Sequence, residues 1–182
     1  MIPRMATPNI ISGAHAIIRR DDELLIVRQE TEWCAHPFWS LPGGTSEPGE
    51  LLIETLCREV REEAGLHVQE ASVAWVMEED RPYSGERLLV AFFEATSWSG
   101  ELCTDDPDGK VTEGRFAPLA EALELLCGQA DSKSPHTIEP LLAYFADDSP
   151  RRPLWQLRRL APDAPAIEVG PASALPIAPA AG

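Results

Sequence analysis

Two short apolar segments near the start of the chain are separated by five polar residues. Residues 14–18 and 24–27 are rich in alanine, isoleucine, leucine and valine, whereas residues 19–23 are all charged. Short apolar segments on either side of a polar turn are typical of two antiparallel strands. A third strand is expected at residues 38–41, where it runs into the turn-forming sequence Pro42-Gly43-Gly44.

Between residues 48 and 64 the apolar spacing becomes helical. Pro48 suits the first turn of a helix, where its missing N–H is not needed, and Glu50 in that turn complements the helix dipole. Gly65 suits the left-handed position that ends many helices. One face of this helix is expected to pack on the sheet, because it carries four aliphatic residues spaced three or four positions apart: Ile53, Leu56, Val60 and Ala64.

The second half of the chain continues the mixture of strands and helices. The expected elements are, in order, strands at 72–77 and 87–95, an acidic loop at 100–114, a lead-in at 115–119, a short helix at 120–126 and a further helix around 137–146. Strands and helices that follow one another in this way predict an α/β fold.

The composition changes near the C-terminus. Seven prolines and many alanines fill residues 150–182. We therefore expect one domain over residues 1–146 and a partly flexible C-terminal extension over residues 147–182. Three side chains of the extension can still dock on the domain: Trp155, Leu157 and Leu160.

The formal net charge of −15 disfavours binding to long nucleic acids and to anionic membranes, because both are polyanions. A small anionic substrate stays compatible, since bound divalent cations reverse the local field. The sequence shows no signal peptide, no apolar stretch long enough to span a membrane and no cysteine pattern with zinc spacing. We expect the protein to lie in the cytoplasm and its four cysteines to be reduced thiols: Cys34, Cys57, Cys103 and Cys127.

Three carboxylates share one edge of the expected helix. Glu59, Glu62 and Glu63 lie at positions i, i+3 and i+4, where like charges repel. A divalent cation would relieve the repulsion, and carboxylate oxygens are the ligands that Mg²⁺ prefers. The alternative is a solvated acidic helix face. Two observations count against it: Arg58 and Arg61 are the helix's only basic residues, and a Gly-Gly turn just before the helix permits close approach of a ligand.

The stretch from residue 44 to residue 66 resembles the Nudix box, G-x5-E-x7-R-E-U-x-E-E-x-G-U, in which U is aliphatic. The resemblance extends over roughly residues 10–146 and includes the sequence Trp39-Ser40-Leu41 before the turn and Arg115-Phe116 after the acidic loop. Such a fixed spacing is far more specific than a short glycine motif. All nine defined positions match: Gly44, Glu50, Arg58, Glu59, Val60, Glu62, Glu63, Gly65 and Leu66.

The resemblance implies an α/β/α sandwich around a mixed β-sheet and a hydrolase that cuts pyrophosphate bonds of nucleotides. Glu59 and Glu63 would be the main metal ligands, with Glu62 a further ligand or the base that activates water. The backbone carbonyl of Gly43 or Gly44 would complete the metal shell. The implied metal is Mg²⁺, with Mn²⁺ as a substitute. Two members of the box, Glu50 and Arg58, would pair and be structural.

Many Nudix enzymes place another acidic residue in a later loop, as a ligand or base. Glu113 is the first candidate for this role, and Asp105, Asp106 and Asp108 compete with it. Arg28 ends a strand that should point toward the site, where a guanidinium can hold a phosphate through two hydrogen bonds; a surface arginine is the alternative.

Aromatic side chains offer less specific signals. Trp39 is expected to pack in the core. A base could stack on an aromatic ring in a loop, but aromatic rings near a site are often only packing. The candidates for stacking are Trp33, Phe38 and Tyr83.

The substrate is less well defined by the sequence. In this family a proline 16 residues after the box suggests ADP-ribose, whereas a tyrosine there suggests dinucleoside polyphosphates. Pro82 and Tyr83 stand 16 and 17 positions after Leu66. We favour an ADP-ribose-like nucleoside diphosphate derivative, followed by nucleoside triphosphates and dinucleoside polyphosphates.

Two other interpretations stay open. The chain could be a catalytically silent nucleotide-sensing module, although it retains every carboxylate of the box. It could also be an isomerase on the same fold, for which Cys34 or Cys103 would have to transfer protons. Messenger-RNA decapping is disfavoured, because the sequence lacks the basic patch that binding to RNA would need. Related enzymes are often dimers, so the resemblance is compatible with a homodimer as well as with a monomer. The expected binding partner is a small nucleotide.

Overall fold

The computed structural model describes residues 7–32, 34, 36–128, 138–146, 152–162, 164 and 166–169. In these residues, nine strands form one sheet and three helices pack against it. The elements are β1 (Asn9–Arg20), β2 (Glu23–Gln29), β3 (Phe38–Ser40), β4 (Gly43–Thr45), α1 (Leu52–Ala64), β5 (His67–Arg81), β6 (Glu86–Ser99), β7 (Val111–Pro118), α2 (Leu119–Cys127), α3 (Ile138–Phe145), β8 (Leu154–Arg158) and β9 (Ile167–Glu168).

The sheet is mixed, with the strand order β3-β2-β1-β6-β5-β8-β9. Strand β1 runs parallel to β6, from the pair Asn9↔Glu86 to the pair Ile18↔Ala95, and β6 is antiparallel to β5. Strands β1 and β2 are antiparallel, as the sequence predicted, but they pair only next to their connecting turn. Beyond that turn β2 pairs with β3 and β7, while the short strand β4 pairs with β1.

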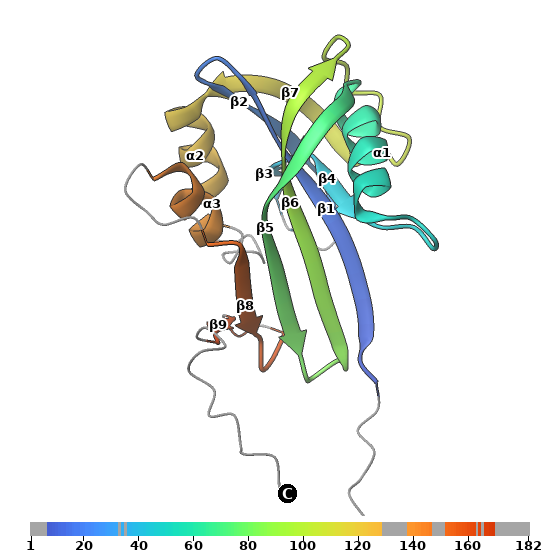
Figure 1. Ribbon diagram of the computed structural model, residues 1–182, viewed down its shortest axis with the longest axis vertical. Helices are drawn as coiled ribbons and strands as arrows, with labels where there is room; N and C mark the ends of the chain where they lie inside the picture. Colours follow the sequence, from blue (N-terminus) through green and yellow to red (C-terminus); the bar gives the residue numbers. More distant parts are fainter. Residues whose placement is uncertain are drawn as a thin grey trace, which may run out of the picture.

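Helices cover both faces of the sheet, which confirms the predicted α/β/α sandwich (Figure 1). Successive residues of β1 point to opposite faces. Ala16 and Ile18 join the core under α1, whereas Ile17 joins the core under α2 and α3. All three of these residues are fully buried.

Helix α1 begins later than the sequence predicted. Leu51 caps it, so Pro48 and Glu50 belong to the preceding loop and not to the first turn. Glu54 occupies the first turn instead and accepts a hydrogen bond from the Leu51 backbone N–H (2.8 Å). Gly65 ends the helix with a φ of 68°, as predicted.

The predicted apolar face of α1 was wrong at one position. Leu56, Val60 and Ala64 are fully buried, but Ile53 is 40% exposed. Thr55 is buried in the neighbourhood of this face, and its hydroxyl oxygen lies 2.9 Å from the hydroxyl oxygen of Ser46. A polar residue is tolerated there because the preceding loop supplies its partner.

Strand β7 includes residues that the sequence assigned to a loop and to a lead-in before a helix. It runs from Val111 to Pro118 and pairs with the whole of β2. The helix that follows, α2, and the later α3 lie close to their predicted bounds.

Two strands lie beyond residue 146, in the segment that the sequence assigned to an extension. Strand β8 pairs in parallel with β5, from Val76↔Leu154 to Asp80↔Arg158. Trp155 and Leu157 are buried in the sheet's core, whereas the expected docking of Leu160 is wrong, because this side chain is 59% exposed.

Two further sequence expectations, on the cysteines and on membrane-spanning helices, can be compared with the described residues. All four cysteines are free thiols. Among the described helices, none has the length and apolar character needed to cross a membrane.

Candidate active site

Gly43 and Gly44, which the sequence assigned to a turn, begin the short strand β4 and bring the chain close to α1; the name glycine turn is kept for these two residues. Gly43 has a φ of 146°, and a Cβ there would collide with the Ala14 carbonyl oxygen, so the close pairing of β4 with β1 requires glycine. At Gly44, a Cβ would lie 2.5 Å from Glu59 Oε1. The bare backbone of Gly44 therefore leaves room for the Glu59 carboxylate.

Glu63 is the most deeply buried carboxylate of the box, with 6% of the residue exposed. Its two oxygens accept hydrogen bonds from the Gly43 backbone N–H (2.7 Å) and from Gln29 Nε2 (2.9 Å). Burial raises the pKa of Glu63 to about 8; the Gly43 hydrogen bond opposes this, and repulsion from Glu59 and Asp106 adds to it. Glu63 thus sits where negative charge is poorly compensated.

Arg58 connects the remaining carboxylates of the box. Its Nη1 donates to Glu59 Oε1 (2.9 Å) and to Glu62 Oε2 (3.1 Å). Burial raises the pKa of Glu59, although Arg58 counteracts this. On its other side Arg58 holds Glu50, with 2.7 Å from Nε to Oε1 and 3.0 Å from Nη2 to Oε2, and also donates to the Thr45 carbonyl (3.1 Å).

Glu50 lies in the loop before α1, and its link to Arg58 fixes that loop. The Arg58 guanidinium lowers the pKa of Glu50 to about 2. Glu50 also accepts hydrogen bonds from the Glu47 backbone N–H (2.8 Å) and the Thr55 hydroxyl (3.1 Å). The loop thereby holds the glycine turn against the carboxylate edge of α1.

The carboxylate edge forms one wall of a pocket of about 360 Å³. A further part of the lining comes from the acidic loop before β7. Asp106 organises that loop by accepting backbone N–H groups from Asp108 (3.1 Å), Lys110 (2.6 Å) and Val111 (2.8 Å). The lining residues are Gln29, Thr31, Gly43, Gly44, Thr45, Glu47, Arg58, Glu59, Glu62, Glu63, Asp106, Asp108 and Lys110.

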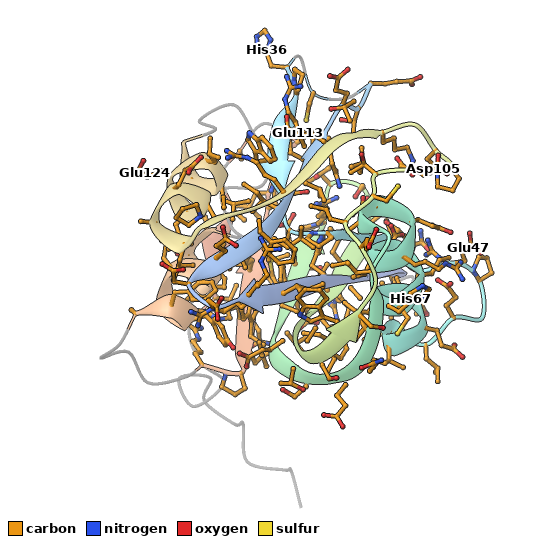
Figure 2. The ribbon with its side chains drawn as sticks, turned by 90° about the horizontal axis from the view of Figure 1, so that it is seen from above. His36, Glu47, His67, Asp105, Glu113 and Glu124 are labelled. Carbon is orange, nitrogen blue, oxygen red and sulfur yellow. The ribbon has the colours of Figure 1, made fainter. Side chains whose placement is uncertain are left out.

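The structure does not bring Glu113 or Arg28 to this pocket. The two residues face each other in the pairing of β7 with β2, and neither lines the pocket. Figure 2 shows Glu113 apart from Asp105 and Glu47, which lie on the α1 side of the molecule. Arg28 is 38% exposed, with its Nη1 3.8 Å from Glu30. Because side chains alternate along a strand, the next residue of β2, Gln29, points to Glu63 instead.

Pro82 and Tyr83 lie in the hairpin between β5 and β6. Both are exposed, and Figure 1 shows this hairpin at the end of the sheet away from α1. Of the proposed stacking residues, Trp33 is outside the described residues and Phe38 is half-buried in β3. Trp39 packs against the core, as predicted, and the guanidinium carbon of Arg115 lies 5.0 Å from the centre of its ring.

Sequence reasoning missed Gln29 and Lys110. The alternation of side chains in β2 contained the signal for Gln29, since Arg28 and Gln29 cannot both face α1. The signal for Lys110 was a single lysine at the end of an otherwise acidic loop.

A divalent cation fits the pocket by chemistry, but its ligands are not yet arranged around one point. In the described part of the chain, no three His, Cys, Asp or Glu side chains are spaced to hold an ion. Glu59 and Glu62 are held by Arg58, while Glu63 is held by Gly43. The oxygen donors are of the kind that Mg²⁺ binds, and the raised pKa of Glu63 marks the place where positive charge is lacking. Binding would exchange some of these hydrogen bonds for metal contacts.

Several known proteins are similar to this chain in sequence or in fold. A human protein named 8-oxo-dGDP phosphatase NUDT18 is 40% identical over 109 residues, which cover 49% of this chain and 33% of that protein. This chain thus spans about a third of the human relative's length. The CTP pyrophosphohydrolase of Escherichia coli (strain K12) is 32% identical over 118 residues, covering 62% of this chain and 85% of the relative.

A solved structure of the same fold is the mutator MutT protein from Bacillus halodurans. It superposes with a TM-score of 0.60 at 22% identity and covers 86% of this chain and 94% of its own. A family model described as the NUDIX domain matches residues 10–138, which include the glycine turn, α1 and the acidic loop. The chain therefore belongs to the NUDIX domain family.

Proposed function

We propose that the protein is a divalent-metal-dependent hydrolase that cuts the pyrophosphate bond of a small nucleotide. The observation that carries this proposal is the pocket that Glu59, Glu62, Glu63 and Asp106 line beside the glycine turn. Hydrolysis of a pyrophosphate bond spreads negative charge over the oxygens around phosphorus, so the enzyme must mainly position groups and neutralise charge.

Glu59, Glu63 and a backbone carbonyl of the glycine turn would hold the metal, with Glu62 beside them. The bound metal would neutralise developing charge and acidify a water molecule. Glu62 is the most exposed of the three glutamates, with 27% of its side chain accessible, so water can reach its carboxylate. Arg58 holds the carboxylates of Glu62 and Glu59 through one nitrogen, Nη1. For the acid contributed by the loop, we place Asp106 ahead of Glu113, because Asp106 lines the pocket.

For the substrate we place nucleoside di- and triphosphates, and oxidised guanine deoxynucleotides first among them, ahead of ADP-ribose. The preference for ADP-ribose was based on Pro82, which lies in a hairpin at the far end of the sheet (Figure 1). The human relative's name specifies 8-oxo-dGDP, and the Escherichia coli relative's name specifies CTP. Both are nucleotides with a free terminal phosphate.

A substrate panel tests this proposal. Purified protein with Mg²⁺ is incubated with 8-oxo-dGDP, 8-oxo-dGTP, CTP, ADP-ribose and a dinucleoside polyphosphate, and the products are identified by chromatography. We expect turnover of at least one di- or triphosphate and a loss of about a hundredfold or more in kcat for Glu63→Gln.

The matched control is Glu124→Gln, which makes the same chemical change on the exposed surface of α2 (Figure 2). It should leave kcat unchanged. If no nucleotide is cut, the hydrolase proposal fails; binding of a nucleotide without turnover would then favour the sensing module. Equal rates for Glu63→Gln and the wild type would also contradict the proposal.

A further inference from the structure

Arg58, although it lines the pocket, has no hydrogen-bond donor left for a substrate. An arginine side chain carries five N–H donors. Those of Arg58 are directed at Glu50 twice and at Glu59, Glu62 and the Thr45 carbonyl once each, at 2.7–3.1 Å. An incoming phosphate could bind Arg58 only by breaking the contacts that hold the box together.

Among the residues that the structure describes, Lys110 is the other positively charged side chain that lines the pocket. Its ammonium carries three donors, and the contact shown for it in the structure is to Asp108 Oδ2 (2.6 Å). Both members of this pair are solvent-exposed, with 52% of the Lys110 side chain and 68% of the Asp108 side chain accessible. Such a pair contributes little to stability, so its exchange for another anion costs little.

The backbone of Lys110 is fixed although its side chain is exposed. Its N–H donates to Asp106 Oδ2 (2.6 Å), and its carbonyl accepts the Glu30 N–H (2.7 Å). One contact belongs to the acidic loop and the other to the end of β2. The Lys110 side chain therefore extends from a fixed backbone position in the lining of the pocket.

We propose that Lys110 binds the phosphate chain of the substrate and favours nucleotides that end in a free phosphate. This inference rests on the proposed function and adds the residue that selects among its substrates. An ammonium recognises charge more than shape. A terminal phosphate carries a charge of about −1.5 to −2, whereas each phosphate inside a chain carries about −1. Lys110 therefore attracts a nucleoside di- or triphosphate more strongly than it attracts ADP-ribose, whose phosphates are both bridged.

The test compares Lys110→Met with Arg20→Met. Arg20 is a closely matched control, because it forms an ion pair of similar length with Glu23 (2.7 Å), is 53% exposed and does not line the pocket. For the di- or triphosphate that the wild type cuts best, Lys110→Met should raise KM about tenfold with kcat within about twofold. For ADP-ribose the rise in KM should be about threefold or less. Lys110→Arg should restore most of the loss, since it keeps the charge.

Binding of inorganic pyrophosphate in the presence of Mg²⁺, measured by calorimetry, gives a readout that does not require turnover. It should weaken in Lys110→Met and stay unchanged in Arg20→Met. Wild-type KM and pyrophosphate binding in a folded Lys110→Met variant would overturn the inference and leave the hydrolase proposal intact. Conversely, if the wild type cut no nucleotide, the proposed function would fail while pyrophosphate binding still tested Lys110.

Discussion

The buried carboxylate of Glu63 accepts a hydrogen bond from the backbone N–H of Gly43, with 2.7 Å between oxygen and nitrogen. This contact joins the last turn of α1 to the strand β4 and so ties the pocket wall to the sheet. The same carboxylate is the group whose pKa is raised to about 8, chiefly by burial. Glu63 therefore fixes the local structure and is also the residue whose protonation state a bound metal would change.

Mg²⁺ affinity should rise with pH up to about 8. A carboxylate must be deprotonated to bind a metal, and Glu63 keeps its proton until the pH approaches its raised pKa. Calorimetric titration in buffers of different ionisation enthalpy should show tighter binding at about pH 8 than at about pH 6, with protons released on binding at the lower pH. The pH dependence should become weaker in Glu63→Gln; an unchanged dependence in that variant would rule out Glu63 as its source.

The sign for folding is the opposite in the metal-free protein. Because the pKa of Glu63 is raised on folding, its contribution to stability is complete below the ordinary value of 4.5 and is lost as the pH rises through about 8. Thermal unfolding in a chelator should thus show a lower melting temperature at about pH 8 than at about pH 6, and Mg²⁺ should stabilise the protein more at the higher pH. The difference between these two pH values should shrink in Glu63→Gln.

Gly44→Ala should reduce kcat about tenfold or more while the protein stays folded. The added Cβ would lie 2.5 Å from Glu59 Oε1 and would push this carboxylate away from the glycine turn. Displacing a carboxylate that is proposed to hold the metal should slow the reaction. Gly44 does not have a positive φ, so alanine fits its backbone.

Gly49→Ala separates the effect of contact from that of backbone strain. Gly49 is in the same loop and has a φ of 94°, but a Cβ there meets nothing within 4 Å. It should lower stability by about 1 kcal/mol and leave kcat unchanged. The two variants are compared by steady-state kinetics and by unfolding in urea; equal kcat values would contradict the importance of the Glu59 contact.

The parts of the site that lie on one element were the parts that the sequence predicted well. Glu59, Glu62 and Glu63 share an edge because the helical repeat allows no other arrangement, and the structure places all three in the pocket. The start of α1 was predicted less well, because Pro48 is compatible with a helix start but equally with the loop it occupies. Helix ends depend on individual capping contacts such as the one between Glu54 and Leu51.

Positions that depend on separate elements were harder to predict. Whether Asp106 or Glu113 reaches the pocket depends on where the acidic loop ends and β7 begins, and on a register shift in the pairing of β2 with β7 beside Arg28 and Gln29. A shift by one residue turns every following side chain to the other face. Likewise, the number of residues between the box and Pro82 does not reveal that Pro82 lies in the hairpin at the far end of β5 and β6, two long strands.

Asp106→Asn should reduce activity about tenfold, and Glu113→Gln should change it by less than about twofold. Asp106 Oδ2 accepts two backbone N–H groups, from Lys110 and Val111, so the variant loosens the loop wall of the pocket as well as removing charge near Glu63. Glu113 is half exposed, and its side chain lies 3.9 Å from Arg115 Nε. Steady-state rates decide between them: a greater loss for Glu113→Gln would restore Glu113 as the acid contributed after the loop.

An ionic cluster attaches the C-terminal strand to the sheet at a distance from the pocket. Glu79 of β5 is only 2% exposed, and its Oε1 accepts hydrogen bonds from Arg159 Nε (2.9 Å) and Arg81 Nε (2.7 Å). Burial alone would raise the pKa of Glu79, but the two arginines lower it. Arg159 itself is nearly buried, and its backbone N–H donates to the Asp80 carbonyl (2.9 Å). Glu79 therefore keeps a buried charge compensated where β8 ends.

Glu79→Gln should lower the free energy of unfolding by about 3 kcal/mol, because it removes the buried anion to which Arg159 and Arg81 donate. Glu78→Gln is the control, since Glu78 is next in the chain, 28% exposed, and paired with Arg87 at 3.3 Å; its loss should stay below about 1 kcal/mol.

Because the pKa of Glu79 is lowered on folding, its contribution is complete above the ordinary value of 4.5 and is lost as the pH falls below it. Urea unfolding near neutral pH and in acid measures both effects. Equal losses for the two variants would show that the buried cluster stabilises the strand no more than a surface pair does, whereas a large loss confined to Glu79→Gln would identify residues after 146 as part of the folded domain.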